Sequence, residues 1–353
     1  DANGDIIPNS GCGSWLMEGQ STNLITYSED FSNASWQKVA SSTVTTNTVI
    51  SPDGTLNADT YKASSSSYGC ILRAITTFDF VSPYTVSFYV KKNNYRYVGL
   101  RLGNLIGASD SYNFFDFDTE TVNNTPAPSA ELSFEKLTNG WYKLSLTGTP
   151  TSSTLADLAL TQSNGSTINP IGTEEVYVYG AQLEQNSFST SYIPTQGASS
   201  TRLQDIANNS GNASLINSSE GVLYAEISTL NGDSGSNRTI SLSDSTTGNQ
   251  IRFYFPINIE GAIISRVDVG GSTIYVFNYS ITTSENPIKI AFRYSSNGMD
   301  FYVNGSLVSS SALVPSFTNN LNSLQFRRGD GSAGEDFYGK NKALAVYKTA
   351  LTD

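Results

Sequence analysis

The sequence predicts an all-β protein built as two tandem antiparallel β-sandwiches. Three observations support this fold class: apolar residues alternate with polar ones in short runs, turn dipeptides separate the runs, and no segment keeps a helical period over several turns. Alternation with a period of two is typical of antiparallel strands that bury one face and expose the other. Short strands at this spacing are typical of sandwiches and jelly rolls.

The predicted strands follow one another along both halves of the chain. In the first half, alternation covers residues 86–90, 98–102 and 142–146. In the second half it covers residues 251–255 and 288–292. The turn signals between strands are Asn139-Gly140, Gly270-Gly271, Asn297-Gly298 and Asn304-Gly305.

The length of 353 residues fits two domains, and composition places a boundary near residue 200. The last strand of the first half is Val176–Leu183, and a stretch rich in Ala, Ser, Asn and Gly covers residues 197–219. Because the chain starts at Asp1 and stops just after an apolar strand, we expect it to be part of a longer protein. We expect an N-terminal segment over 1–22, a first sandwich over 23–200, a linker over 201–219 and a second sandwich over 220–353.

Composition narrows the possible chemistry. The chain has no His and two Cys, which excludes His-dependent nucleophiles, His metal ligands, four-Cys zinc sites and iron–sulfur clusters. Cys12 and Cys70 either form a disulfide or stay free and buried, and the sequence leaves both open. The net charge of -11 argues against a nucleic-acid partner. No apolar run is long enough for membrane insertion, and the N-terminus does not read as a signal peptide.

The charge is unevenly divided. Residues 1–201 hold 9 Lys and Arg against 18 Asp and Glu, whereas residues 202–353 hold 11 against 13. The second half is therefore nearly balanced, which makes it the better place to look for an anionic ligand.

Three stretches of the first half carry a resemblance to a known family. Residues 23–36 (NLITYSEDFSNASW), 176–184 (VYVYGAQLE) and 190–194 (TSYIP) resemble a carbohydrate-binding-module-like jelly roll, and residues 87–92 and 139–146 fit the same pattern. The resemblance covers roughly residues 10–200. This module recurs in phage tail and virion-surface proteins and in surface proteins of marine and gut bacteria.

The second half resembles a laminin-G or concanavalin-A-like sandwich over about residues 220–353. The residues that carry this resemblance are 288–305 (IKIAFRYSSNGMDFYVNG) and 343–352 (ALAVYKTALT). In both families the usual role is recognition of glycans or surfaces, and a fold alone does not establish function.

The first half offers aromatic and basic side chains for sugar binding, because flat rings pack on pyranose C–H faces while polar groups meet the hydroxyls. Strand alternation places some of them opposite the core, and Trp36, which follows a polar loop, is expected to line an edge. The alternative is a structural role: Trp141 caps the core, and tyrosines are common on strands because they pack well there. The candidates are Trp36, Tyr95, Tyr97, Arg101 and Trp141.

The second half places basic and aromatic side chains at outward positions beside inward Phe or Ile. If their strands are neighbours in one sheet, they form a basic face that suits an anionic polysaccharide. The alternative is a solvated face paired with nearby Asp or Glu, or a surface that packs on the first sandwich. The candidates are Arg252, Tyr254, Lys289, Arg293 and Arg327.

Two acidic regions are candidates for structural calcium, and the sequence implies no required cofactor. Asp116 and Asp118 alternate with Phe115 and Phe117 along residues 114–122, as does Glu120. Asp330 lies on a Gly-rich loop. Calcium prefers oxygen ligands gathered by curved loops, so a solvated strand edge or loop is the favoured interpretation of both.

Catalysis is not expected, because no run of paired carboxylates typical of sandwich-fold glycosidases is present. The sequence predicts non-catalytic recognition of surface glycans, as part of a phage tail fibre, receptor-binding or virion-surface protein. The alternatives are an accessory carbohydrate-binding region of a secreted bacterial polysaccharide-degrading enzyme and a purely structural virion decoration. The resemblance implies a homo-oligomer (a trimer is common in phage fibres), other virion proteins as partners, and a virion-surface or extracellular location.

Overall fold

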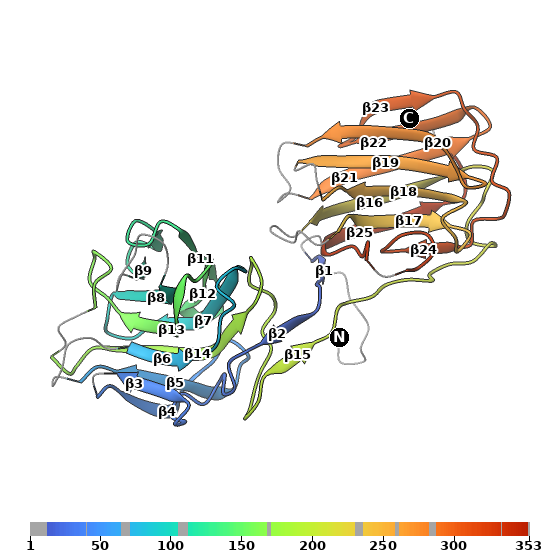
Figure 1. Ribbon diagram of the computed structural model, residues 1–353. Coiled ribbons are helices and arrows are strands. Elements are labelled where there is room, and N and C mark those ends of the chain that lie inside the picture. The colour runs from blue at the N-terminus through green and yellow to red at the C-terminus, as the bar shows by residue number, and fades with distance from the viewer. Residues whose placement is uncertain are drawn as a thin grey trace. The chain divides into compact units, whose positions relative to one another are not determined.

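The computed structural model shows two all-β units (Figure 1). One unit is Gln20–Leu203, here called the first sandwich. The other, the second sandwich, joins the chain up to Gly19 with the chain from Gln204 onward. The structure describes residues 13–39, 41–64, 71–104, 112–167, 171–229, 236–257, 261–281, 287–332 and 334–351.

The first sandwich consists of two six-stranded antiparallel sheets and a two-stranded ribbon. One sheet has the order β10-β9-β8-β13-β6-β3, the other β11-β12-β7-β14-β5-β4, and the ribbon pairs β15 with β2. Their bounds are β2 Ser21–Asn23, β3 Trp36–Val39, β4 Thr43–Ile50, β5 Leu56–Lys62, β6 Ile71–Ile75, β7 Tyr84–Lys92, β8 Tyr97–Asn104, β9 Asn113–Asp116, β10 Thr121–Asn123, β11 Ala130–Lys136, β12 Trp141–Gly148, β13 Ser152–Leu160, β14 Glu175–Glu184 and β15 Ser200–Arg202.

The core of the first sandwich lies between its two sheets and confirms the predicted alternation. Every second side chain of β7, β8 and β12 is fully or almost fully buried there. Burying a large aliphatic or aromatic side chain is worth about 1.5–3 kcal/mol, so this alternation fixes which face of each strand turns inward. The buried residues include Val86, Phe88, Val90, Val98, Leu100, Leu102, Tyr142, Leu144 and Leu146.

The second sandwich consists of a six-stranded sheet, β1-β25-β16-β21-β22-β23, and a five-stranded sheet, β20-β19-β18-β17-β24. Its core again follows strand alternation, with Phe253 and Phe292 buried between the sheets. The bounds are β1 Trp15–Met17, β16 Gly221–Thr229, β17 Arg238–Ser243, β18 Gln250–Phe255, β19 Ala262–Val269, β20 Ser272–Ser280, β21 Ile288–Ser295, β22 Gly298–Val303, β23 Ser306–Ser311, β24 Ser323–Gln325 and β25 Gly339–Tyr347.

The N-terminal segment takes part in the second sandwich. Trp15 pairs with Asn341 and Met17 with Gly339, so β1 forms one edge of the sheet beside β25, as the blue and red arrows show (Figure 1). The segment 201–219, predicted as a linker, also differs from expectation. Ile216 is buried in the second core, and Ser210 forms a bridge with Leu324. A short polar segment predicts a loop, because backbone hydrogen bonds to a neighbouring strand do not require alternating apolar side chains.

Helical structure is nearly absent from the described residues. They contain one 3-10 turn, η1 at Thr138–Gly140, and no helix long and apolar enough to cross a membrane.

Candidate functional site

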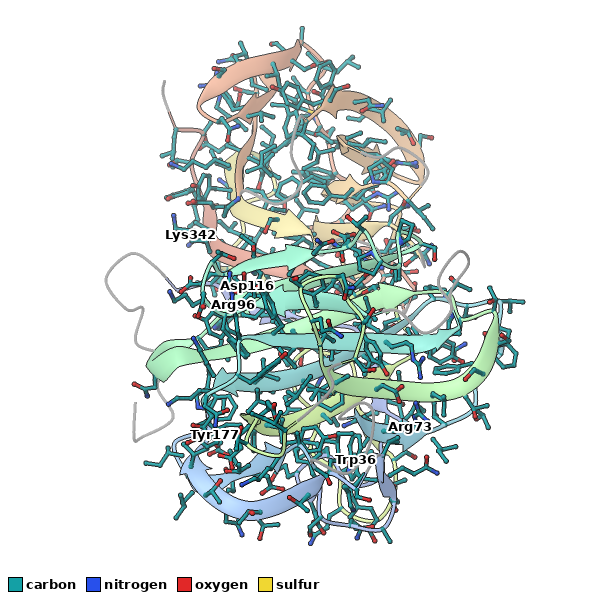
Figure 2. All side chains as sticks on the ribbon, turned by 90° about the vertical axis from the view of Figure 1, so that its left-hand side faces the viewer. Trp36, Arg73, Arg96, Asp116, Tyr177 and Lys342 are labelled. Atoms are coloured by element: carbon teal, nitrogen blue, oxygen red, sulfur yellow. The ribbon has the colours of Figure 1, made fainter. Side chains whose placement is uncertain are left out.

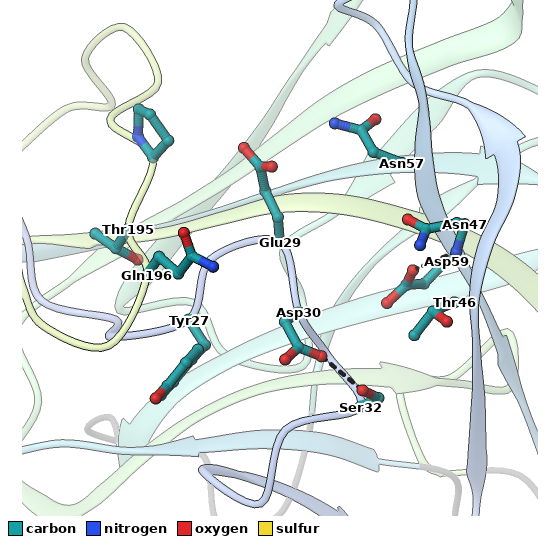
Figure 3. A pocket seen from close by; sticks show the side chains of 11 residues that line it. Tyr27, Glu29, Asp30, Ser32, Thr46, Asn47, Asn57, Asp59, Thr195 and Gln196 are labelled. Atoms are coloured by element: carbon teal, nitrogen blue, oxygen red, sulfur yellow. Dashed lines mark hydrogen bonds between the residues drawn. The ribbon is translucent and has the colours of Figure 1, made fainter.

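An open cleft of about 680 Å³ lies on the first sandwich, and most of the side chains that line it are polar (Figure 3). Three parts of the chain build it: the loop after β2, the β4–β5 hairpin, and the segment after Ile193. The lining residues are Tyr27, Glu29, Asp30, Ser32, Thr46, Asn47, Asn57, Asp59, Pro194, Thr195 and Gln196.

The family-like motifs of the first sandwich hold two walls of this cleft together. Asn23 Nδ2 donates to the carbonyls of Ala181 (3.0 Å) and Ile193 (2.8 Å), while its Oδ1 accepts from the Leu183 N–H (3.1 Å). Gln182 Oε1 accepts from the Ile193 N–H at 2.6 Å. Asn23 and Gln182 are buried, so these bonds form in low dielectric and fix the closing segment beside the opening one.

The residues that follow Asn23 and Ile193 along the chain form the two walls of the cleft. Tyr27 bridges to Gln196, and the Gly197 N–H donates to the Thr26 carbonyl at 2.7 Å. The Thr195 N–H donates to Ser28 Oγ at 2.8 Å. The two walls are therefore joined by backbone and side-chain bonds, which makes the cleft largely pre-formed.

Trp36 shapes the first wall from inside. Its Nε1 donates to the Tyr27 carbonyl at 2.7 Å, and its ring packs on Phe31 at 5.1 Å between centroids. Asp30 Oδ1 accepts from Ser32 Oγ at 2.6 Å and the Asn33 N–H at 3.1 Å, which closes the turn between the two anchored ends. The dashed line in Figure 3 marks the Asp30–Ser32 bond.

Two tyrosine hydroxyls orient Glu29 on the same wall. Tyr179 donates to Asp53 Oδ2 at 2.9 Å and lies 3.2 Å from Glu29 Oε1, and the Tyr192 hydroxyl lies 3.1 Å from Glu29 Oε1. Burial, with the neighbouring carboxylates adding to it, raises the pKa of both tyrosines. Both hydroxyls therefore stay protonated. Each lies within hydrogen-bond distance of Glu29 but closer to another acceptor, Asp53 Oδ2 for Tyr179 and Ser28 Oγ (2.6 Å) for Tyr192.

Asp59 on β5 faces that wall from the other side of the cleft (Figure 3). Its side chain is 1% exposed, and Oδ1 accepts from the Asn47 N–H at 3.0 Å. By strict hydrogen-bond geometry Oδ2 has no partner among the described residues, and neither has Oδ1 of Asn57, although the Phe31 N–H is also directed at the Asp59 carboxyl. Burial raises the pKa of Asp59 to about 6, and the negative charge of Asp30 adds to the rise. An unpaired buried acceptor is costly, so these two atoms indicate a place where a ligand donates.

The cleft can therefore receive hydrogen-bond donors but not anions. None of its lining side chains is Lys or Arg, and three are carboxylates, Glu29, Asp30 and Asp59. Hydroxyl groups of a neutral sugar donate to carboxylate and amide oxygens, while Tyr27 and Pro194 offer apolar surface to the ring. A ligand that carries a carboxylate or sulfate is repelled.

The predicted sugar contacts of the first sandwich lie elsewhere, and three of them have almost no exposed surface. Trp36 lies on the edge strand β3, but its ring is buried in the core, and Trp141 is 1% exposed, packed with Ala58 and Tyr179. Arg101 lies on the predicted side of β8 but is only 7% exposed. For Trp141 the burial agrees with the structural alternative.

Arg101 is covered because it belongs to a buried ion cluster. Its Nη2 and the Nε of Arg73 lie 2.6 and 2.7 Å from the carboxylate oxygens of Asp157, which is fully buried. Figure 2 labels Arg73 on the first sandwich. Strand alternation gives the side of the sheet correctly here, but it carries no information about the segment that covers it.

Tyr95 and Tyr97 are half-buried and are not brought to the cleft. The Tyr95 hydroxyl donates to the Thr161 carbonyl at 2.9 Å, and Tyr97 packs edge-on against Phe114 at 5.8 Å. They keep part of their surface, and their role in ligand contact stays a prediction.

The basic face predicted for the second sandwich is divided between two sheets. Arg252 and Tyr254 lie on β18, whereas Lys289 and Arg293 lie on β21 of the other sheet. The condition for one continuous face, that these strands are neighbours in one sheet, is therefore not met. Arg327, which follows β24, donates to Asp336 and to the Gly331 carbonyl.

Arg252 and Arg327 are also largely buried, at 7% and 6% exposed. Arg252 pairs with Glu335 at 2.8 Å and lies over the Tyr254 ring at 4.8 Å. The alternative of ion-paired arginines thus describes this sheet, where the segment after β24 covers the outer face.

The carboxylates predicted as calcium ligands, Asp116, Asp118 and Asp330, form ion pairs with basic side chains. Arg96 donates to Asp116 at 2.7 Å, and this bond lowers the pKa of Asp116 to about 2; Figure 2 labels both residues. Asp118 contacts Lys92 and lies 3.3 Å from Arg96, and Asp330 pairs with Arg328 at 2.9 Å. Within the described ranges, no group of three or more Asp, Glu, Cys or His is placed to hold a metal ion.

The stretch 114–122, predicted as one strand, is a tight hairpin. Asp116 Oδ1 accepts from the Asp118 N–H at 2.9 Å, and Glu120 has a φ of 53°. These features turn the chain, so the three carboxylates do not line one strand face. Cys12 and Cys70 lie outside the described residues.

Sequence reasoning missed the residues of the cleft itself. Glu29 and Asp30 lie inside the recognised motif 23–36, but their polarity reads as a simple surface loop. Asp59 follows Ala58, and both are buried, which breaks the alternation that would have placed one of them outside.

Comparisons with known proteins agree with the fold class. Residues 212–353 match the family model described as the concanavalin A-like lectin/glucanases superfamily. No curated protein matches the chain.

Solved structures show weak similarity. The CBM40 of the Ruminococcus gnavus IT-sialidase bound to α2,3-sialyllactose is 15% identical, with 42% of this chain and 90% of that chain covered and a TM-score of 0.34. Sheep galectin-11 in complex with glycerol is 12% identical, over 41% and 99% of the chains, with a TM-score of 0.27. Domains LG4-5 of the mouse laminin α1 chain are 12% identical, over 79% and 86%, with a TM-score of 0.29.

Proposed function

We propose that this protein recognises glycans without chemical turnover, and that the cleft of the first sandwich binds a neutral sugar. The observation that carries the proposal is the pair of buried acceptors without partners, Asp59 Oδ2 and Asn57 Oδ1, in the lining of an open cleft. Sugar hydroxyls supply the missing donors, and each such bond to a charged acceptor is worth about 1.5–3 kcal/mol.

Further support comes from the rest of the chain. The superfamily matched by residues 212–353 contains lectins, and residues 23–36 and 176–194 resemble carbohydrate-binding modules. A single shallow cleft gives weak binding, and several copies in one assembly raise the overall avidity without new contacts.

The biological setting that we propose is a phage tail fibre, a receptor-binding protein or another virion-surface protein, at the virion surface or outside the cell. The support is the resemblance of the first sandwich to modules of such proteins, which also implies a homo-oligomer. Copies of the cleft would then engage a repetitive surface polysaccharide together.

A glycan array probed with the whole chain tests the proposal. We expect saturable binding to one or more neutral glycans, which Asn57→Ala weakens about tenfold because a buried acceptor is lost. The matched control is Gln37→Ala, an exposed side chain on β3 outside the cleft lining, which leaves binding unchanged.

Two other outcomes point to the alternative functions. No binding to any glycan, by the whole chain or by its oligomer, indicates a structural virion decoration. Release of new reducing ends from a bound glycan shows catalysis, and it contradicts recognition without turnover.

A further inference from the structure

A second recess lies on the outer face of the six-stranded sheet of the second sandwich, where the strand register aligns two tyrosines around a small residue. Tyr224 on β16 pairs with Ala291 on β21, and Ala291 pairs with Tyr302 on β22. Neighbouring strands lie about 4.8 Å apart, so the two tyrosine backbones stand about 9.5 Å apart with alanine as the floor between them. We call Tyr224, Ala291 and Tyr302 the tyrosine slot.

The slot is part of a groove of about 540 Å³. Leu307, which pairs with Tyr302 and is 53% exposed, extends one wall, and Leu351 lies at an end. Tyr224, Ala291 and Tyr302 all keep part of their surface exposed. Aromatic walls over a methyl floor suit the apolar face of a ring, and the volume suits one or two sugar rings.

A basic side chain lies at each end of the floor of the tyrosine slot. Lys289 and Arg293 flank Ala291 on β21, two residues to either side, so strand alternation places both on the face of the slot. Arg293 is fixed by Asp300 Oδ2 at 2.9 Å and the Leu351 carbonyl at 3.0 Å, over the Tyr302 ring. Its position is therefore set by the fold.

Lys289 is the cation available to a ligand. It is exposed, and no carboxylate lies within ion-pair distance of it among the described residues. Its cross-strand neighbour Glu226 is paired with Lys342 at 2.9 Å, which offsets the negative charge opposite Lys289 in the sheet. An ammonium group at the end of an aromatic slot attracts an anion held by a ring.

We propose that the tyrosine slot binds a carboxylated sugar, with the pyranose ring between Tyr224 and Tyr302 and its carboxylate on Lys289. The slot differs in charge from the cleft of the first sandwich, which has no cation in its lining. The two sites therefore select different sugars, and the slot does not depend on the cleft.

Calorimetric titration of the whole chain with methyl α-D-galacturonoside, and with methyl α-D-galactoside as the uncharged counterpart, tests the slot. We expect the uronoside to bind more tightly than the galactoside, with affinity falling as salt is added. Lys289→Gln lowers uronoside affinity about tenfold and leaves galactoside binding unchanged. Lys340→Gln is the matched control, because Lys340 is exposed on β25 and does not line the groove.

Ala291→Leu fills the floor of the slot and abolishes binding of both sugars there. Because Ala291 lies on the outer face, thermal unfolding of this variant should match that of the parent chain. If Ala291→Leu does not fold, the comparison of Lys289→Gln with Lys340→Gln still decides the role of the cation.

Four results would overturn the proposal: no uronoside binding, equal effects of Lys289→Gln and Lys340→Gln, full binding by folded Ala291→Leu, or tighter binding of a poly-glutamate peptide. Asn57→Ala tells the two sites apart, since it weakens neutral-glycan binding in the cleft and leaves the slot unaffected. Failure of the slot with intact neutral binding therefore leaves the proposed function standing.

Discussion

Replacing Asp59 with Asn changes stability and ligand binding in opposite directions. The carboxylate is 1% exposed, and burial raises its pKa from 3.8 to about 6. At about 1.4 kcal/mol for each pKa unit, holding the charge in the folded protein costs roughly 3 kcal/mol at neutral pH. Asn is uncharged, and its Oδ1 can still accept the Asn47 N–H. We therefore expect Asp59→Asn to unfold at higher denaturant concentration than the parent chain at pH 7.

The pH dependence follows from the sign of the pKa change. Because the folded pKa lies above the unfolded one, the contribution of Asp59 to stability is fully present below pH 4 and is lost as the pH rises through 6. The advantage of Asp59→Asn is therefore absent at pH 4, grows between pH 4 and 6, and is complete at pH 7. Urea unfolding across this range measures it, with Glu131→Gln, an exposed carboxylate on β11, as the control.

Asp59→Asn should weaken ligand binding, although it raises stability. The variant loses a charged acceptor for a sugar hydroxyl, so affinity for a neutral glycan falls about tenfold. Lowering the pH through 6 weakens binding by the parent chain and has little effect on the variant. If Asp59→Asn is less stable than the parent chain at pH 7, or if the difference does not vary with pH, the reasoning about an unpaired buried carboxylate is refuted.

Three further substitutions test other parts of the first sandwich. Trp36→Phe removes the 2.7 Å bond to the Tyr27 carbonyl, so glycan affinity measured by calorimetry should fall more than tenfold, and an unchanged affinity contradicts the role given to this wall. Asp157→Asn leaves the buried Arg101 and the half-buried Arg73 without their shared carboxylate and should lower the free energy of unfolding by about 3–5 kcal/mol. Arg96→Ala removes the half-exposed partner of the buried Asp116, so the free energy of unfolding at pH 7 should fall by about 1–2 kcal/mol while glycan affinity stays unchanged; an unchanged unfolding midpoint would contradict the role given to this pair.

The strand core was predictable from the sequence because hydrophobic burial repeats with the pleat. Val86, Phe88 and Val90 follow that rule and lie in the core. The outer face was less predictable. Arg101 and Arg252 lie on the sheet faces that alternation assigns, yet other side chains and segments cover them.

The cleft could not be predicted from a linear pattern. Asp59 and Asp30 meet because the β4–β5 hairpin lies beside the loop after β2, and no local propensity encodes that distance. The motif signal did locate the walls, since Asn23 and Gln182 join them. It gave no sign that Oδ2 of Asp59 would be left without a donor.

The pairing of β1 with β25 makes the first sandwich an insertion within the sheet of the second. Trp15 pairs with Asn341 across a long sequence separation, so closing this edge carries a high loop-closure cost. A chain cut near residue 200 would lose β1 and expose the edge of β25 to pairing with another copy. Domain dissection of this protein should therefore excise Gln20–Leu203 and rejoin the flanking segments, which keeps the second sandwich whole.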